Sequence, residues 1–535
     1  MVNRILFVLA AALPLLGGCS STFTPKTCTL DKDCGDGLIC GLQDGQAVCL
    51  PTPTTCAHDS DCGDGLICGM KSSQAACVAP ADAPLHIGMS APVSGPSQAL
   101  GTEMKLGILL AFDEQNAAGG IRGRQLVLDF LDDAYQPALA EQNTRDLLEV
   151  KPGEGEVKCP TTTTPAVAGQ MPVSTTPLNR GPDAVLALIG NVGTPTMVRS
   201  APIALETGTL FFGAFTGAAK ILRDDLAGSC HKYVFNVRAS YAEEARATLE
   251  LFFKSKVPDA AHLMSFDQND SFGQAGYDGF VAAYKDIKGE FTPAPADPAT
   301  PITRFRYTRD DDGNVKTQVG ATAAYIGKLL AADSADHTVG ILMTDTYGPA
   351  TTFITNLRQW QYAEDAEQAT LKKATRLTLI FSNVSFVGPN ALASRLKDAG
   401  TIKTPAGAML PYTDNVLVSQ VVPNYESDSS DVVKQYRKLI MKAAATPSFT
   451  SLEGYISGRI FVAGLLAHEG AFTPEALITT FENLPKLSLG VGASSGFSPT
   501  DHNYSKSVWG TTLDSTAAFK NRYFWSEGTP LQLFE

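Results

Sequence analysis

The chain has 535 residues and a formal net charge of −13 at pH 7. Its apolar content of 44% and its charged content of 18% are typical of a water-soluble globular protein. The acidic balance, which no basic patch relieves, argues against nucleic acid as a partner. The chain is longer than one hydrophobic core usually sustains, so at least two compact parts are expected.

The N-terminus has the pattern of an export signal. Arg4 supplies a positive start, residues 5–16 are apolar, and Leu16-Gly17-Gly18-Cys19 has the small residues of a cleavage site. This tetrapeptide resembles a bacterial lipobox, so residues 1–18 are predicted to be a lipoprotein signal peptide and Cys19 the lipidated first residue. An ordinary secretory peptide cleaved near Cys19 is the alternative. The serine after Cys19 favours the outer membrane.

Residues 19–82 are read as a lipid-anchored stalk built on an internal cysteine repeat. Two copies share their cysteine spacings and the core DCGDGLICG. The cysteines are Cys28, Cys34, Cys40 and Cys49 in the first copy and Cys56, Cys62, Cys68 and Cys77 in the second. In an exported segment with little apolar bulk we expect two disulfides per copy, but four cysteines allow three pairings and the spacing does not choose among them. A metal is disfavoured, because the compartment is oxidising and no CxxC motif occurs.

A strand, a long helix and a second strand are predicted between residues 87 and 131. The strands are Ile87–Ser90 and Gln125–Leu131, and the helix is expected to open at Pro96 and to end at Gly119-Gly120. Ser94 then becomes a candidate helix cap. Such units build parallel sheets, which bind ligands just beyond the carboxyl ends of their strands.

Residues 151–182 are dense in Pro, Thr and Gly and are predicted to form a surface insertion. Cys159, inside it, and Cys230 are the two cysteines left over, and in an exported protein we expect them to form a disulfide that pins the insertion to the first lobe. A cysteine nucleophile is disfavoured, because His231 is the one histidine nearby.

Two further strands end in turns like the one at Ser94. Ala184–Ile189 leads to Gly193, Thr194 and a proline, and Leu210–Phe212 leads to Phe215 and Thr216. Unpaired N–H groups at helix N-termini can hold a carboxylate without a buried countercharge, so Ser94, Thr194 and Thr216 are candidates for that role. These residues could equally serve only as helix caps.

The second half of the chain predicts another set of strands whose carboxyl ends meet at one edge, with different side chains in the loops that follow. The strands are His262–Phe266, Val339–Thr344 and Leu377–Phe381, and the loops after them are aromatic and acidic. The candidate contacts to an apolar ligand body are Tyr241, Phe272, Tyr347 and Phe386, while Asp267 or Asp345 could meet an ammonium group. Each ring could instead belong to the core.

Several segments together resemble the leucine/isoleucine/valine-binding proteins, which are type I periplasmic solute-binding proteins of ABC transporters. From about residue 84 to the C-terminus they follow the family's order. They are PVSG, FDEQNAAGGIRGRQL, GAFTGAAKILR, SFGQAGYDGF, SFVGPNAL, SLEGYISGRIFVAGL and FSPTDHNYSKSVWG.

The resemblance implies an α/β fold of two lobes, each a largely parallel sheet flanked by helices. The lobes are expected at 84–237 plus 424–495 and at 238–423 plus 496–535. In the family, positions matching Thr194 and Thr216 hold the carboxylate of an amino acid, and a tyrosine or similar ring stands at Phe272 and Tyr347. The family's ammonium-binding acid falls near Ser385, where this chain has no acid, a departure that weighs against an ordinary amino acid as the ligand.

These features predict a monomeric, lipid-anchored solute-binding protein in the envelope of a Gram-negative bacterium. It would close around an amino acid or a related carboxylate or amide and deliver this ligand to an ABC permease. A ligand-sensing or surface interaction protein is the alternative. We expect no enzyme and no cofactor, because the sequence has no metal cluster, phosphate loop or nucleophile motif, and His502 is read as structural.

Overall fold

The computed structural model describes residues 34, 38–43, 46–51, 56, 62, 66–71, 74–78, 83–159, 176–218, 223, 230–256, 262–289, 302–492 and 495–534. The predicted signal peptide, Cys19 and Cys28 lie outside these residues. The chain divides into two compact units, Met1–Ala79 and Pro80–Glu535. Among the described residues, no helix has both the length and the apolar character needed to cross a membrane.

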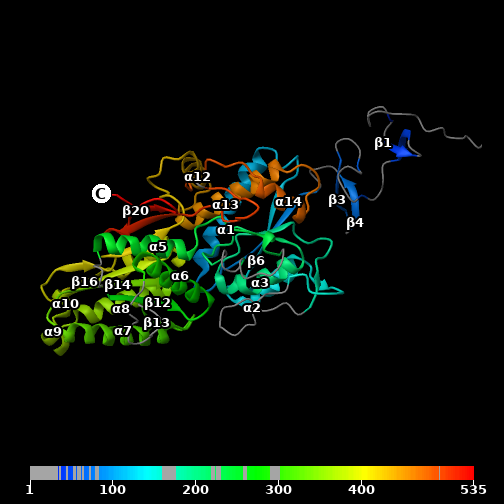
Figure 1. Ribbon diagram of the computed structural model, residues 1–535. Helices are drawn as coiled ribbons and strands as arrows, with labels where there is room; N and C mark the ends of the chain where they lie inside the picture. The colour runs from blue at the N-terminus through cyan, green and yellow to red at the C-terminus, as the bar shows by residue number, and fades with distance from the viewer. Residues whose placement is uncertain are drawn as a thin grey trace, which may run out of the picture. The chain divides into compact units, whose positions relative to one another are not determined.

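The first unit contains one β-hairpin in each copy of the cysteine repeat (Figure 1). The hairpins pair β1 (Leu38–Gln43) with β2 (Gln46–Pro51), and β3 (Ile67–Lys71) with β4 (Gln74–Val78). Cys40 stands opposite Cys49 in the first hairpin, and Cys68 stands opposite Cys77 in the second. The sequence repeat is therefore also a structural repeat.

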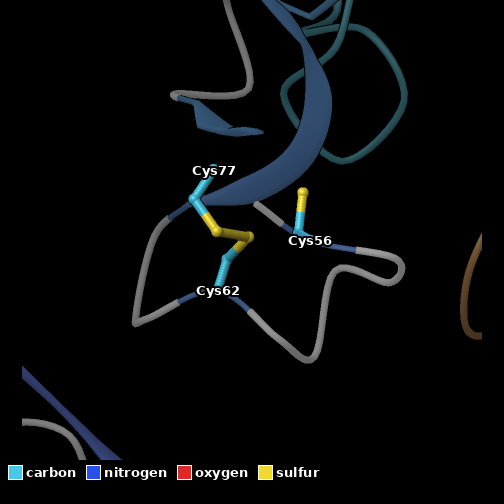
Figure 2. Close-up of side chains that lie close together, drawn as sticks. All are labelled: Cys56, Cys62 and Cys77. Carbon is cyan, nitrogen blue, oxygen red and sulfur yellow. A yellow bond between two sulfur atoms is a disulfide. The ribbon is translucent and has the colours of Figure 1, made fainter. Parts of the chain in front are cut away.

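Disulfides join Cys34 to Cys49 and Cys62 to Cys77, each across a separation of 15 residues. In both copies the bond links the second cysteine to the fourth, which selects among the pairings that the spacing left open. Figure 2 shows Cys56 beside the Cys62–Cys77 bond, and the three sulfur atoms lie within 4.8 Å of one another. Because Cys56 is disulfide-bonded as well, this group provides no thiolate to bind a metal.

The first lobe of the second unit is built on a five-stranded parallel sheet with the order β11-β10-β9-β5-β6. Its strands are β5 (Leu85–Ala91), β6 (Leu126–Asp132), β9 (Ala187–Ile189), β10 (Leu210–Phe212) and β11 (Val234–Phe235). The helices between them are α1 (Gln98–Ala117), α2 (Pro137–Leu147) and α3 (Thr194–Glu206). Consecutive residues of β9 and β10 are buried, as expected for strands covered on both faces.

Three helices from the C-terminal part of the chain pack beside the first lobe. They are α12 (Asp431–Lys442), α13 (Phe449–Ala467) and α14 (Pro474–Glu482), and α13 packs along α1 (Figure 1). The two helices touch through glycine: a Cβ on Gly107 would lie 2.0 Å from the carbonyl oxygen of Ser451, and one on Gly454 would lie 2.4 Å from that of Met104. The backbones of α1 and α13 are therefore in direct contact.

The second lobe is built on an eight-stranded sheet with the order β13-β12-β14-β15-β18-β19-β20-β21. The first five strands are parallel: β12 (His262–Gln268), β13 (Thr303–Tyr307), β14 (His337–Thr344), β15 (Leu377–Asn383) and β18 (Val416–Gln420). Three antiparallel strands follow: β19 (Ser507–Leu513), β20 (Phe519–Ser526) and β21 (Gln532–Leu533). The flanking helices include α5 (Tyr241–Leu251), α6 (Ser271–Lys288), α7 (Asp312–Ala332), α8 (Tyr347–Tyr362) and α11 (Pro389–Ala399).

These two sheets confirm the predicted two-lobed α/β fold. The lobe boundaries at residues 237, 423 and 495 stay a prediction. Two of the segments that connect the lobes run side by side: the amide of Asn236 donates to the carbonyl of His502, and the amide of Tyr504 donates to the carbonyl of Asn236, both at 2.8 Å.

The predicted insertion is attached to the first lobe. Its ends pair as a short antiparallel ladder of β7 (Lys151–Pro152) and β8 (Leu178–Asn179). A disulfide joins Cys159 to Cys230, as predicted, and the amide of Cys159 donates to the Glu206 carboxylate at 2.8 Å. The disulfide and this hydrogen bond hold the insertion against the end of α3.

Candidate ligand-binding site

Thr194 and Thr216 meet at the carboxyl edge of the first sheet. Their hydroxyl oxygens lie 2.6 Å apart, and both residues are buried. The N-cap of α3 is Gly193, at φ 103°, where a Cβ would lie 2.4 Å from the ring of Tyr135. The prediction that Thr194 could cap this helix is therefore wrong, and its hydroxyl is available to Thr216 because glycine provides the turn.

Ser94 lies apart from this pair. Helix α1 begins at Gln98, two residues later than the predicted start at Pro96, and Ser97 occupies the N-cap position. Ser94 is exposed and hydrogen-bonds to Asp132, whose pKa this contact helps to lower. The predicted helix cap at Ser94 is thus wrong, because the turn at Gly95 continues for two residues before the helix starts.

Four of the predicted aromatic residues form one cluster that joins the two lobes. The Phe386 ring centroid lies 5.0 Å from that of Phe215 and 4.7 Å from that of Phe272, and the Phe272 centroid lies 5.5 Å from that of Tyr241. All four side chains are buried. We call the contact between the lobes the seam; its residues are Tyr135, Thr194, Phe215, Thr216, Tyr241, Phe272 and Phe386.

Tyr241 reaches the threonine pair from the second lobe. It is the first residue of α5, whose N-terminus is fixed by a capping box between Ser240 and Glu243, and its amide donates to the Gly217 carbonyl at 3.0 Å. The ring covers Gly217 so closely that a Cβ there would lie 2.4 Å from it. Burial raises the pKa of the Tyr241 phenol to about 12, so this hydroxyl stays protonated beside Thr216.

Tyr347 also connects the lobes. It opens α8 in the second lobe, and its hydroxyl accepts a hydrogen bond from the amide of Ala99, in the first turn of α1, at 3.4 Å. The guanidinium of Arg395 lies 5.0 Å from its ring centroid. Tyr347 therefore lies just beyond the carboxyl end of β14, at the edge of the second sheet.

The two candidate acids have different surroundings. Asp267 is buried and accepts two parallel hydrogen bonds from Arg304, at 2.7 and 2.9 Å, and Arg306 pairs with it at 3.3 Å. Asp345 is equally buried, yet neither of its carboxylate oxygens has a hydrogen-bond partner among the described residues. Burial, together with the negative charge of Asp267, raises the pKa of Asp345 well above its ordinary value.

Ser385 is held by groups of the protein itself. Arg238 donates to its hydroxyl, while its own amide and hydroxyl donate to Glu244 at 2.7 and 2.9 Å. Glu244 also accepts from Ser419 at 2.5 Å. Arg238 is paired with Glu453 at 3.5 Å, and burial raises the pKa of Glu453 to about 7 although Arg238 opposes this shift. A guanidinium and a carboxylate of this chain thus surround Ser385.

Sequence reasoning missed Tyr135. It follows β6 at φ 62°, its ring centroid lies 6.1 Å from that of Phe386, and its carbonyl accepts a hydrogen bond from Arg309 of the second lobe at 3.0 Å. The rule that ligand-binding residues follow strand ends applies to Tyr135 as well. It was missed because the turn LDDAYQ has no glycine, although Pro137 opens the next helix as prolines do after the other turns.

A cavity of about 220 Å³ in the second lobe does not coincide with the seam. Its lining residues are Leu251, Ile380, Asn415, Leu417, Thr512 and Arg522. None of the predicted site residues is among them. Six of the predicted site residues instead meet at the seam: Thr194, Phe215, Thr216, Tyr241, Phe272 and Phe386.

The two lobes have the fold of the periplasmic binding proteins. The family model described as "Periplasmic binding protein" matches residues 84–169. Over 57 residues the chain is 46% identical to the Leu/Ile/Val-binding protein BraC3 of Rhizobium johnstonii and to a Leu/Ile/Val-binding protein homolog of Brucella melitensis. Each match spans 11% of this chain and 16% of the relative.

Solved structures extend the likeness over both lobes. A possible leucine/isoleucine/valine-binding protein from Rhodopirellula baltica is 29% identical with a TM-score of 0.63, covering 83% of this chain and 98% of that one. The Streptococcus pneumoniae protein LivJ in complex with isoleucine is 14% identical with a TM-score of 0.57, covering 84% and 99%. At this low identity, the likeness to LivJ shows only that the two chains share a fold. The predicted resemblance to leucine/isoleucine/valine-binding proteins is confirmed, and the matched family consists of binding proteins.

Proposed function

We propose that this chain is an extracytoplasmic solute-binding lipoprotein that captures a small ligand by closure of its two lobes and delivers it to an ABC permease. The observation that carries the proposal is the convergence of strand-end residues from both lobes at the seam. Phe215 and Thr216 come from the first lobe, and Tyr241 and Phe386 come from the second. Binding between the lobes supplies the free energy that favours the closed form.

The ligand class follows from the chemistry of the seam. Hydroxyl groups at Thr194, Thr216 and Tyr241 can bond to a carboxylate or an amide, and the α3 N-terminus at Gly193 adds backbone N–H groups nearby. The rings of Phe272 and Phe386 can enclose an apolar body. An amino acid or a related carboxylate or amide fits these groups.

Thermal unfolding of the full chain tests this function. The panel consists of aliphatic amino acids, small carboxylates, amides and polyamines, because a ligand that binds only the folded protein raises the unfolding midpoint. If compounds of one chemical class raise the unfolding midpoint, and the rise grows with their concentration, the result supports solute binding and identifies the ligand class. Unchanged midpoints across the panel argue against the proposal. A permease gene and an ATPase gene next to this one would favour transport.

The cysteine-rich unit favours a second candidate, in which the protein senses a ligand or binds a partner at the envelope. Two disulfide-linked hairpins form a compact unit separate from the lobes. A shorter, unstructured linker would suffice to tether a binding protein. Deletion of residues 28–77 from the mature chain tests this: full transport activity after deletion favours the transport function alone, and loss of a bound partner favours the second candidate.

A further inference from the structure

The cavity in the second lobe lies between the sheet and the end of α5. Its apolar wall consists of three buried residues, Leu251 at the end of α5, Ile380 on β15 and Leu417 near the start of β18. The seam, in contrast, lies beyond the carboxyl ends of these strands. The cavity volume of about 220 Å³ exceeds the roughly 150 Å³ that is enough to hold benzene, so a small organic molecule fits inside.

A β-bulge lies beside this cavity. Strands β19 and β20 pair residue by residue up to a register shift between Gly510 and Thr511. Gly510 stands opposite Tyr523 and Thr511 stands opposite Asn521, so Arg522 is an extra residue without a partner on β19. Bulges of this kind interrupt the alternation of a strand and can redirect a side chain.

The bulge turns Arg522 towards α5. In a regular strand, neighbouring side chains point to opposite faces of the sheet. Here Tyr523 faces α5, where its hydroxyl lies 3.4 Å from that of Thr248, and Arg522 lines the cavity together with Leu251 of the same helix. Two consecutive residues of β20 therefore lie on one face, and the second cationic side chain on this strand is placed in the cavity wall.

The positive charge of Arg522 is not neutralised by the protein. Its side chain is partly buried, yet among the described residues its guanidinium has neither an ion pair nor a hydrogen bond. The acids close in sequence to the wall residues have cations of their own: Glu250 pairs with Arg246 at 2.8 Å, Asp414 with Arg358 at 3.6 Å and Asp514 with Lys520 at 3.4 Å. The cavity thus carries a net positive charge on its polar side.

Two neutral groups complete that polar side. The Asn415 amide nitrogen donates to Asp414 at 3.2 Å and keeps a second N–H for another acceptor. The Thr512 hydroxyl donates to the Val416 carbonyl at 3.2 Å. Arg522 and Asn415 are therefore donors towards the cavity, and an acceptor with a negative charge complements them.

We propose that this cavity is a second ligand site, separate from the seam, and that it binds a small monocarboxylate with a short apolar chain. A guanidinium can hold a carboxylate through two parallel hydrogen bonds, and the chain would lie against Leu251, Ile380 and Leu417. Phosphate fits less well, because one guanidinium offsets one charge and an apolar wall offers a second charge no hydrogen bond. The proposal does not depend on the function proposed for the seam.

Nuclear magnetic resonance of the full chain tests the site directly. The isotope-labelled methyl group of Ile380, assigned by the loss of its signal in Ile380→Val, reports on the cavity. We expect 3-methylbutanoate to shift this signal with a dissociation constant of about 1 mM or below. The neutral 3-methylbutanamide should bind at least about tenfold more weakly, because it lacks the charge that pairs with Arg522. No shift at concentrations about tenfold higher, or equal binding of the amide, overturns the proposal.

Variants of β20 test the role of Arg522. Arg522→Gln should weaken 3-methylbutanoate binding at least about tenfold, and Arg522→Lys, which keeps the charge but loses the paired hydrogen bonds, should weaken it less. Lys520→Gln is the matched control, because it removes an exposed cation of the same strand that is paired with Asp514, and it should bind within about twofold of the unmodified protein. Equal losses in Arg522→Gln and Lys520→Gln would assign the effect to net charge and contradict the proposal.

Thr216→Val distinguishes the cavity from the seam. The shift of the Ile380 methyl signal should titrate within about twofold of the unmodified protein in this variant, since Thr216 is not a wall residue. Loss of the shift in Thr216→Val would mean that Ile380 reports on a ligand at the seam. That result overturns the second site and supports solute binding at the seam, so the two proposals fail separately.

Discussion

The hydroxyl groups of Thr194 and Thr216 share a hydrogen bond of 2.6 Å, although the two residues are 22 positions apart in the chain. Thr194 begins α3 and Thr216 follows β10, so the pairing of β9 with β10 brings them together. Each hydroxyl can accept one hydrogen bond and donate another, so the pair can turn a free donor towards a ligand.

Replacing Thr216 by valine removes one of these hydroxyls and keeps the shape of the side chain. We expect ligand affinity to fall about fivefold, since one net hydrogen bond is worth about 1 kcal/mol. Titration with the ligand found in the thermal panel measures the change. Thr216→Ser, which keeps the hydroxyl, is the control and should bind within about twofold of the unmodified protein. Unchanged affinity in Thr216→Val would remove Thr216 from the site.

The backbone contact between α1 and α13 makes Gly107 intolerant of any side chain. A methyl group there meets the Ser451 carbonyl, so Gly107→Ala should lower the free energy of unfolding by about 1–3 kcal/mol, the usual cost of overpacking. Gly320→Ala on α7 is the matched control, because nothing lies within 4 Å of a Cβ at that position and alanine favours a helix. It should raise stability by up to about 1 kcal/mol. Equal effects of the two replacements, measured by urea unfolding, would contradict the contact.

The Cys159–Cys230 disulfide closes a loop of 71 residues within the first lobe. Replacing both cysteines by alanine should cost about 2–5 kcal/mol of stability, because the unfolded chain loses this constraint. Chemical denaturation under oxidising conditions measures the loss. Ligand affinity should stay within about twofold, since neither residue lies at the seam. A variant as stable as the unmodified protein would show that the insertion is held mainly by the hydrogen bonds to Glu206.

The paired histidines His262 and His337 predict a stability that depends on pH. Their ring nitrogens lie 3.1 Å apart, and burial together with the nearby His337 lowers the pKa of His262. The unfolded chain therefore binds a proton at His262 more readily than the folded one, so this residue adds stability above pH ~6.5 that is lost as the pH falls. Denaturation midpoints at several pH values should show a weaker decline in His262→Gln. A parallel decline in both proteins would contradict the expectation.

Strand ends were the most predictable part of the site. The strands before Thr194, Thr216 and Tyr347 are apolar runs closed by turn residues, and the structure places all three at the carboxyl edges of the sheets. The helix caps were less predictable. The N-cap of α3 is Gly193 and not Thr194. The chain enters this helix with a positive φ, which glycine adopts without strain, and no side-chain hydroxyl caps the helix.

The charge state of the site could not be predicted in the same way. The carboxylate of Asp267 is already paired with Arg304 and Arg306, which alternate along β13. This five-residue edge strand was not predicted from the sequence. Which strand stands beside β12 depends on tertiary packing, which local patterns do not encode. The same holds for Arg238, whose partners Glu244, Ser385 and Glu453 are brought together only by the folded chain.

The bridge between Asn236 and Asn503 has a mechanical consequence. Two connecting segments that are hydrogen-bonded to each other behave as a ribbon, which bends easily across its flat face and resists twisting and sliding in its plane. In the closure proposed above, this pair of connections would favour bending of one lobe towards the other over twisting or sliding. Such a bend would return Phe386 to the same position against Phe215 each time the lobes close, so the stiffness of the connection would reproduce the fit at the seam.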